Sequence, residues 1–420
     1  MRINKCQLLA VTLFLASLMS FACDKVEVEV SDNINYKEVI DGIINEIKPD
    51  LVLKVEDFTD INDCLRYRAN LDGFVMIVLN RDCKVSSAIL LPGNTTFIIN
   101  NCTITQADYT FDNVFRSGNV VLDGNDAYYL PDKIDTLHNI SIIGVGKAVI
   151  KGPDMNRIDP NNHNSPMVTA DVYGARTHMV SLCLVDGGEI RGLTFTRPRG
   201  WSVCFEYSSN FTIRDCYFES TNMDSPYDFH ATGDGIDLRR GCHHFNIYNI
   251  SGSTTDDLIA LNTGPVRDFE SNRYYSAYSY KITRRLEKQD LKVSDIHDIH
   301  IDNIVKHGIN ERASGALIRL NCEGDKELYN IYISKGEYSG IVTKGNRQAI
   351  YFSHFSGPYT PDSIHDIFIN DVKIVNTSRT IDNVLDATIK LKNVWASKLF
   401  NGSGGGVYNY LYNEGLVVTD

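Results

Sequence analysis

A short pattern recurs through most of this 420-residue chain: an apolar residue, any residue, a second apolar residue, any residue, and then Gly, Asn or Asp. We find it at Phe97–Asn101, Ile140–Gly144, Ile190–Gly192, Phe211–Asp215, Phe245–Asn249, Ile299–Asn303, Ile331–Lys335, Ile367–Asp371 and Ile389–Asn393. Gly, Asn and Asp tolerate a positive φ, so each copy describes a strand with one buried face followed by a sharp bend. Lys335 departs from this rule.

The spacing of the copies predicts the fold. The steps from Ile190 to Ile213 and from Ile369 to Leu391 have room for three short strands and three turns, and longer steps need loops inserted at the turns. With 22 Tyr and 18 Phe besides many Ile and Val, the chain can bury a long core. We therefore predict an all-β chain folded as a right-handed parallel β-helix, a solenoid. A β-sandwich with coincidental turn residues is the alternative.

The sequence divides into four segments. Residues 1–22 read as a signal peptide, 23–95 as an N-terminal cap, 96–400 as the β-helix that carries the site, and 401–420 as a C-terminal tail or cap. Helical spacing of apolar residues from Tyr36 to Ile47 marks the cap. We expect the cap to seal the open end of the solenoid.

The N-terminus predicts export. Arg2 and Lys5 precede an apolar run from Leu8 to Ala22, which is too short to span a membrane with these flanks. Cys23 follows a small-any-small cleavage pattern and resembles the lipidated cysteine of bacterial lipoproteins. We therefore expect either an outer-membrane-anchored lipoprotein or a periplasmic protein, with the lipid as the only membrane contact.

Charge and cysteine usage exclude several classes. The net charge of −12 argues against nucleic acid and against anionic membranes as partners, and it disfavours acidic polysaccharides unless basic residues line the cleft. The chain has no C-x-x-C pair, so a structural zinc site is not expected. Cys64 with Cys83 is the one disulfide that we would pair.

Three carboxylates are expected to meet on neighbouring coils. Gly233–Leu238 aligns with Asp256–Leu261 at an offset of one coil, which places Ile236 over Ile259 and Leu238 over Leu261. Strands in a sheet lie about 4.8 Å apart, so Asp234 and Asp257 should be neighbours, with Asp256 one residue earlier and Asp237 on the outward face. Inverting glycosidases need an acid and a base roughly 6.5–9.5 Å apart, which one coil and a side-chain offset can supply.

Crowding of these acids is itself chemically useful. Like charges at short range cannot all ionise, so one carboxyl can stay protonated as an acid while its neighbour activates water. The alternative is that Asp234 and Asp256 only bend the chain, since aspartates are ordinary at the turns of a β-helix.

The paired motifs resemble those of the family 28 glycoside hydrolases, the polygalacturonase clan, which carry Asn-Thr-Asp-Gly and Gly-Asp-Asp segments one coil apart. Asp234 matches the first motif, and Asp256 and Asp257 match the second. The resemblance implies a right-handed, pectin-lyase-like β-helix and an inverting reaction with Asp257 as general acid and Asp234 and Asp256 activating water. It also implies that Trp201 stacks on a sugar ring; a core aromatic is the alternative.

Two basic motifs of that family, Gly-His-Gly and Arg-Ile-Lys, are missing at the next coils. The equivalent strand here is Gly315–Leu320, preceded by His307. The substrate-binding candidates are therefore Asp237, Arg239, Arg319, Trp201 and His307. Arg239 and Arg319 have outward parity; a solvated salt bridge is the alternative for Arg319.

Two further features of the sequence are a long insertion and a group of histidines. Residues 264–295 form an insertion rich in Arg and Tyr, which either arches over the cleft and blocks one end or is plain surface. The histidine pair His243-His244 and the pair His297 and His300 would need converging acids to hold a metal ion; at strand starts we expect them to face water. We predict no catalytic metal and no cofactor.

Three function classes follow. The leading one is an exported glycoside hydrolase acting on a plant-type, pectic polysaccharide or its oligosaccharides. The second is a polysaccharide lyase or epimerase on the same fold, for which Arg319 near Asp237 is the only indication. The third is a noncatalytic, carbohydrate-binding surface protein. Fold alone does not decide among them.

Overall fold

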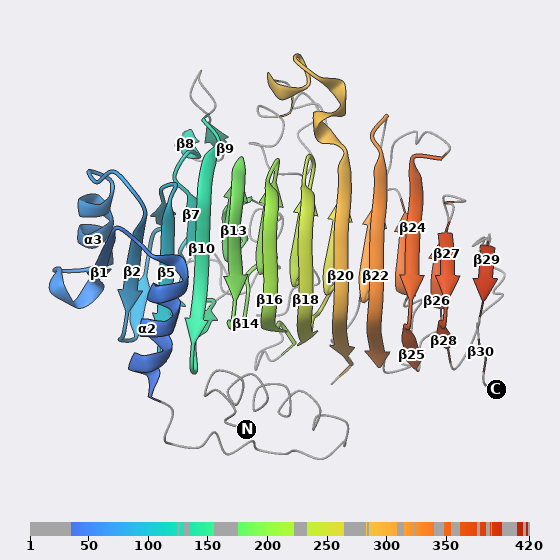
Figure 1. Cartoon of the computed structure of the whole chain (residues 1–420), viewed down its shortest axis with the longest axis horizontal. Coiled ribbons are helices and arrows are strands. Elements are labelled where there is room, and N and C mark those ends of the chain that lie inside the picture. The colour runs from blue at the N-terminus through green and yellow to red at the C-terminus, as the bar shows by residue number, and fades with distance from the viewer. Residues whose placement is uncertain are drawn as a thin grey trace, which may run out of the picture.

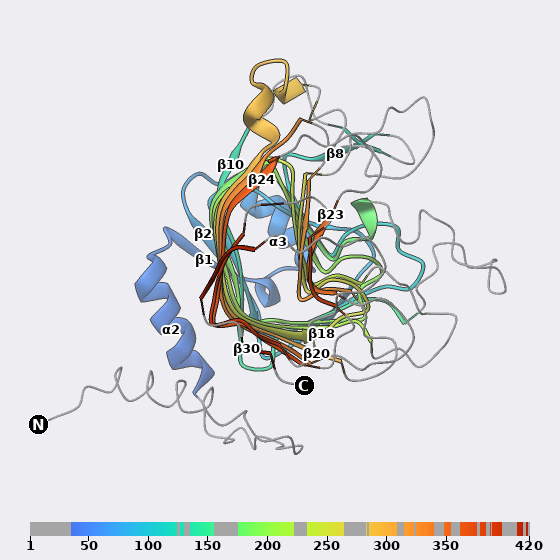
Figure 2. The ribbon, with the colours of Figure 1, turned by 90° about the vertical axis from the view of Figure 1, so that its right-hand side faces the viewer.

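The structure is a computed structural model, and its strands coil into a right-handed parallel β-helix, as the repeat predicted. Figure 1 shows the strands side by side along the long axis, and Figure 2 looks along that axis. The described residues are 35–123, 127–129, 135–154, 175–221, 233–263, 283, 285–308, 315–322, 325–339, 348–353, 362–375, 379–383, 387, 389–396, 410–414 and 417–418.

Within the described residues, the larger of two parallel sheets has 19 strands. Its strands are β1 (Leu51–Lys54), β2 (Val75–Leu79), β3 (Cys83–Val85), β5 (Thr95–Asn100), β6 (Thr103–Gln106), β10 (Leu137–Val145), β11 (Val149–Lys151), β13 (Val185–Arg191), β14 (Thr194–Thr196), β16 (Ser209–Glu219), β18 (His243–Ser253), β20 (Ile296–His307), β22 (Leu328–Ser339), β24 (Ile364–Asn370), β25 (Lys373–Val375), β27 (Ile389–Lys392), β28 (Trp395–Ala396), β29 (Tyr410–Glu414) and β30 (Val417–Val418). We call it the long sheet.

A second parallel sheet, the short sheet, has nine strands in the described part of the chain and forms the other wall of the coil. It contains β4 (Ile89–Leu91), β7 (Phe115–Ser117), β12 (Val180–Cys183), β15 (Val203–Glu206), β17 (Ile236–Arg239), β19 (Ile259–Asn262), β21 (Ile318–Asn321), β23 (Gln348–Ser353) and β26 (Arg379–Asn383). An antiparallel pair, β8 (Val121–Asp123) and β9 (Ala127–Tyr129), stands apart from both sheets. Short 3₁₀ turns lie at Val55–Asp57, Ala175–Thr177 and Leu291–Ser294.

The bends have the backbone conformation that the repeat predicted. Positive φ occurs at eight of the nine positions, Asn101, Gly192, Asp215, Asn249, Asn303, Lys335, Asp371 and Asn393. Lys335 therefore adopts the left-handed conformation (φ 52°) although its side chain disfavours it. Gly144 is the exception, and there glycine has another cause: a Cβ would lie 2.1 Å from the carbonyl oxygen of Gly192.

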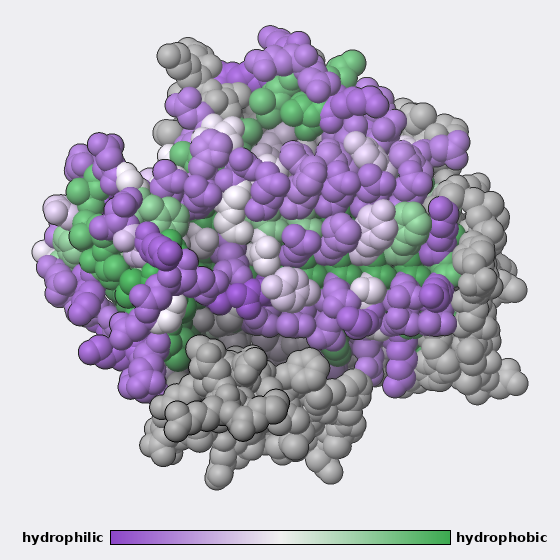
Figure 3. All heavy atoms as spheres, in the orientation of Figure 1, coloured by the Kyte–Doolittle hydropathy of each residue, from purple (hydrophilic) through white to green (hydrophobic). Residues whose placement is uncertain are grey.

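The core is a stack of apolar side chains that runs the length of the coil. Register aligns Ile213 with Ile247, Ile247 with Ile301, and Ile301 with Ile333, and each of these side chains is at most 1% exposed. One such residue on every rung makes burial continuous along the axis. Figure 3 shows the opposite, outer face of the long sheet, which is mostly hydrophilic.

The N-terminal segment differs in part from the expected cap. The helix α2 (Tyr36–Ile47) is confirmed at the predicted residues, but its Ile43 packs with Met76 and Val78 on the outer face of the long sheet. A second helix, α3 (Ile61–Arg68), packs into the core itself through Cys64 and its apolar neighbours, so α3 contributes to closing the open end. Parallel pairing already begins between β1 and β2, so segment 23–95 also supplies the first rungs.

The expected disulfide between Cys64 and Cys83 is wrong. Both are free thiols: Cys64 is fully buried on the side of α3 that faces the core, whereas Cys83 is the first residue of β3 and is half-buried. Burial raises the pKa of Cys64 to about 12, so it stays a neutral thiol. In the described part of the chain, no helix has the length and apolar character needed to cross a membrane. The predicted signal segment and Cys23 lie outside the described residues.

Candidate active site

The short sheet positions the predicted acids. Ile236 pairs with Ile259 and Leu238 with Leu261, as the one-coil alignment predicted, and all four side chains are buried in the core. Asp237, between Ile236 and Leu238, therefore points outward, where its row continues through Cys204 on one side and Ala260, Arg319 and Tyr351 on the other.

The acids that precede these strands lie on the same two coils. The amide of Gly235 donates to the carbonyl of Asp257 (3.0 Å), so the pairing extends beyond the strands and sets Asp234 beside Asp257. Asp234 and Asp237 are joined by a side-chain hydrogen bond. Asp234, Asp237 and Asp257 are at most 5% exposed, and Asp256 is partly exposed.

Hydroxyl groups and a glycine fix the backbone that carries the acids. Thr255 Oγ1 accepts from the Gly233 amide (3.0 Å), and Ser220 Oγ donates to the Gly233 carbonyl (2.8 Å) while accepting from the Thr255 amide (2.8 Å). On the next coil, Gly315 has φ +69° and a Cβ there would lie 2.3 Å from the carbonyl carbon of Asp256. Only glycine permits so close an approach to the paired aspartates.

Burial and mutual repulsion give the acids unusual pKa values. The pKa of Asp256 is raised to about 8, chiefly by burial and then by the charge of Asp257, while Arg319 and Lys306 oppose the rise. The pKa values of Asp234 and Asp237 are also raised well above the ordinary value, again first by burial and then by neighbouring carboxylates. The site therefore holds protons at neutral pH that exposed aspartates would have lost.

Asp257 has a different set of contacts. Its Oδ1 accepts from the Ala316 amide (2.6 Å), and its Oδ2 lies 3.6 Å from Nη1 of Arg319. Arg319 also donates through Nε to Ser353 Oγ (3.2 Å), and its guanidinium lies over the Tyr351 ring. The outward parity predicted for Arg319 places it directly against the acids, with its side chain 20% exposed.

Trp201 lies outside the apolar core, in a cluster on the outward side. Its ring stacks on His178 with centroids 4.5 Å apart, and the Arg239 guanidinium lies 5.1 Å from its ring centre. Burial, together with the charge of Arg239, lowers the pKa of His178 to about 3, so this imidazole is neutral. Arg239 itself is 3% exposed, and its positive charge opposes the rise in the pKa of Asp237.

His307, a predicted substrate-binding residue, is the last residue of a strand of the long sheet. It is exposed at the end of β20, pairs with Ser339 on β22, and has Glu337 as its charged neighbour. The preceding residue, Lys306, contacts the backbone of the acids and was not predicted from the sequence. Its fully buried ammonium donates to Thr254 Oγ1 (2.8 Å) and to the carbonyl oxygen of Asp256.

A signal for Lys306 was present in the sequence. It stands two residues after Ile304, at the inward parity of an apolar alternation, where a lysine needs buried acceptors. By contrast, the insertion 264–295 that was considered as a cover for the cleft lies mostly outside the described residues, in 264–282 and 284.

Comparisons with known proteins identify the fold. No protein-family model and no curated protein matches the chain. A variant tailspike protein of the Escherichia coli bacteriophage HK620, in complex with a pentasaccharide, matches with 12% identity and a TM-score of 0.52 over 91% of this chain and 68% of that one. The family 28 exopolygalacturonase of Yersinia enterocolitica has 10% identity and a TM-score of 0.41 over 88% of this chain and 78% of that one.

A polygalacturonase from Erwinia carotovora ssp. carotovora is a further similar structure, with 14% identity and a TM-score of 0.44 over 88% of this chain and 96% of that one. At these identities, the tailspike match supports the fold alone. The chain is thus a right-handed parallel β-helix protein with a cluster of buried aspartates on the outward side of its short sheet.

Proposed function

We propose that this chain is an exported glycoside hydrolase that cleaves a plant-type, pectic polysaccharide or its oligosaccharides with inversion at the anomeric carbon. One observation carries the proposal: Asp256, with a pKa raised to about 8, adjoins Asp257, which faces a backbone amide and a guanidinium. Neighbouring carboxyls in unequal environments are the arrangement that separates an acid from a base.

We assign the general acid to Asp256, although the family resemblance implied Asp257. Below pH 8 Asp256 holds a proton, and its partly exposed side chain can deliver that proton to the glycosidic oxygen as the bond to the anomeric carbon breaks. Asp257, with Asp234 beside it, then accepts a proton from the water whose oxygen attacks the same carbon from the opposite face. One proton enters the leaving group and one leaves the water, so the reaction balances.

The charges around the acids support an anionic sugar. The net charge of −12 repels such a substrate, but Arg319 is partly exposed beside Asp257, and Arg239, on the coil before Asp257, lies over Trp201. A guanidinium can bind a carboxylate through two parallel hydrogen bonds. A protein of this fold binds a pentasaccharide, which agrees with an oligosaccharide as ligand.

The test measures reducing-end release and ultraviolet absorbance in parallel on a panel of pectic and neutral glycans. Wild type is compared with Asp256→Asn and Asp257→Asn; Asp215→Asn, at an exposed bend whose positive φ suits Asn, is the matched control. We expect reducing ends without absorbance, and a loss of about 10²- to 10⁴-fold in each site variant, the range for a general acid or base. The control should keep wild-type activity.

Other outcomes would replace the proposal. An absorbing product would indicate the lyase alternative, because eliminative cleavage leaves a conjugated double bond. Glycan binding without any cleavage, unchanged in both site variants, would indicate a noncatalytic binding protein. Activity that survives Asp256→Asn but not Asp257→Asn would return the general acid to Asp257. The anomer first formed, read by NMR, tests inversion separately.

A further inference from the structure

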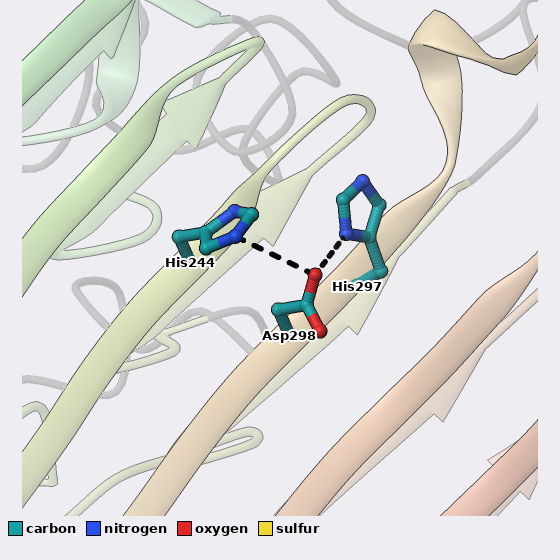
Figure 4. Close-up of side chains that lie close together, drawn as sticks. All are labelled: His244, His297 and Asp298. Atoms are coloured by element: carbon teal, nitrogen blue, oxygen red, sulfur yellow. Dashed lines mark hydrogen bonds and ion pairs between the residues drawn. The ribbon is translucent and has the colours of Figure 1, made fainter.

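A second cluster of polar side chains lies away from the acids, on the long sheet. His244 on β18 and His297 and Asp298 on β20 offer ligand atoms that all lie within 4.8 Å of one another (Figure 4). Nδ1 of His297 is 2.7 Å from Oδ2 of Asp298, and Nε2 of His244 is 3.7 Å from the same oxygen. Asp298, the residue after His297, is thus an acid that converges on both histidines.

These separations suit a small transition-metal ion. Zinc binds imidazole nitrogen and carboxylate oxygen at about 2.0–2.2 Å in tetrahedral sites, so two of its ligand atoms lie about 3.4 Å apart. The two measured separations, 2.7 and 3.7 Å, lie on either side of that value. The two imidazole nitrogens lie within 4.8 Å of each other, so all three ligand atoms are near enough to surround one ion after rotation of the side chains.

The surroundings hold the ligands in place. The His297 ring is stacked between His243 and Tyr329, with centroids 4.9 Å away on each side. Oδ1 of Asp298 accepts from Asn330 Nδ2 (3.1 Å), which leaves Oδ2 turned to the histidines. Such outer contacts orient the ligands of metal sites and are part of a built site.

His244 is unusual for its position in the coil. It has φ +58° at a bend where the other coils place Asn139, Gly187, Asn210, Asp298, Asn330 and Asp366, all with positive φ. An asparagine at this bend can donate a side-chain hydrogen bond to the neighbouring coil, as Asn139 Nδ2 does to Asn94 Oδ1 (3.0 Å). A histidine at the same place lacks that amide group. It supplies instead an imidazole directed at Asp298 on the next coil.

We propose that His244, His297 and Asp298 form a binding site for a divalent transition-metal ion, zinc in the first instance, that clamps two successive coils together. Two imidazoles and a carboxylate are ligands that zinc prefers, and three protein ligands leave a fourth position for water. The His244 side chain is 55% exposed, so an ion can enter from solvent. The site lies on a different sheet from the acids and does not depend on the proposed hydrolase activity.

The chain contains its own control. His365 and Asp366 repeat the pairing, with Nδ1 and Oδ2 2.8 Å apart and Asp366 at positive φ, but the preceding coil presents Tyr329 and Asn330 there instead of a second histidine. If a His-Asp pair alone sufficed, this second pair would bind equally well. The proposal requires the third ligand from the neighbouring coil.

The experiment titrates Zn²⁺ into chelator-treated, tag-free protein by calorimetry and follows the thermal midpoint with and without the ion. Asn139, Asn210 and Asn330 hold the same positive φ at this bend on other coils, so His244→Asn removes the ligand while keeping the backbone. His365→Phe keeps the ring stack on Tyr329 and serves as control. We expect one saturable site in wild type and His365→Phe, at least about 10-fold weaker in His244→Asn. Zinc should raise the midpoint in the first two proteins only.

Two results would overturn the proposal: no saturable binding to wild type, or equal affinity in wild type and His244→Asn. Either would mean that the cluster is a hydrogen-bonded ladder of surface side chains. Replacing zinc with Co²⁺ adds a second readout, because a site with nitrogen ligands gives visible absorption that His244→Asn should abolish. The circular dichroism of each variant verifies that it is folded.

Discussion

At the scale of single residues, the aspartates of the short sheet are costly to bury as charged groups, and the same environment suits them to proton transfer. Three of the four are almost fully buried, and the fully buried Lys306 donates to a neutral carbonyl oxygen beside them. Buried carboxyls are kept neutral by protonation because their charged forms are poorly solvated there. The raised pKa that prepares Asp256 to donate a proton should therefore make the fold sensitive to pH.

This sensitivity gives a stability prediction for Asp256. Its folded pKa of about 8 lies above the unfolded value of about 3.9, so between these pH values the folded chain binds a proton that the unfolded chain has lost. Its contribution to stability is complete below about pH 4 and is lost as pH rises through 8. The maximum slope is about 1.4 kcal/mol per pH unit for one proton.

Replacing Asp256 by Asn should therefore flatten the fall of the unfolding free energy between pH 5 and pH 8, and leave the variant more stable than wild type at pH 8. Urea titrations at several pH values measure this slope. Asp41→Asn, at an exposed position of α2, is the control and should leave the slope unchanged. A slope unaltered by Asp256→Asn would mean that its carboxyl does not retain the proton.

At the scale of elements, the bends of the long strands set the coil. The side chains at these bends are linked from turn to turn: Asn303 donates to Asn249 (2.8 Å), and Asn393 donates to Asp371 (2.8 Å). Lys335 holds the same backbone conformation without such a link, and its ammonium instead lies 3.2 Å from Asp302. An exposed ion pair of this kind contributes about 0–1 kcal/mol.

Exchanging the residue types at two bends should change stability in opposite directions. Lys335→Asn relieves a left-handed lysine, which costs about 1 kcal/mol, and loses a weak ion pair, so we expect a gain of about 0.5 kcal/mol. Asn303→Lys imposes that cost and breaks the link to Asn249, so we expect a loss of about 1 kcal/mol or more. Chemical denaturation measures both. Equal effects of the same sign would show that backbone conformation does not control these bends.

The sequence predicted these elements because its signals are local. The alternation of apolar residues and the left-handed residue that ends each copy both fall within five consecutive positions. The offset of one coil then placed Ile236 on Ile259 and Asp234 beside Asp257. Contacts between distant segments were not predictable in this way. Lys306 reaches Asp256 from the other sheet, and His244 meets Asp298 across an insertion, so neither pair has a fixed spacing in the chain.

At the scale of the molecule, the two sheets carry different chemistry. The short sheet bears the aspartates with Arg239 and Arg319, whereas the long sheet bears the histidine cluster and, at its N-terminal strands, the helix α2. A solenoid grows by adding rungs, so the two faces can vary independently. The described cysteines are free, so the coil is held by its core and its hydrogen bonds and has no covalent links in that part.

Export of the whole chain can be tested at Cys23. We propose that the segment before it directs the protein out of the cytoplasm and that Cys23 becomes lipidated, since it follows a short apolar run and a small-any-small pattern. One or two acyl chains anchor a protein through burial of their methylene groups. The wild type should therefore sediment with membranes of a bacterial host and resist washing with high salt, whereas Cys23→Ser should move to the soluble fraction.

Cys64→Ser, which removes a thiol from the core, is the matched control and should sediment like wild type if it folds. Wild type in the soluble periplasmic fraction would show export without an anchor, and wild type in the cytoplasm would contradict export and with it a pectic polysaccharide as substrate.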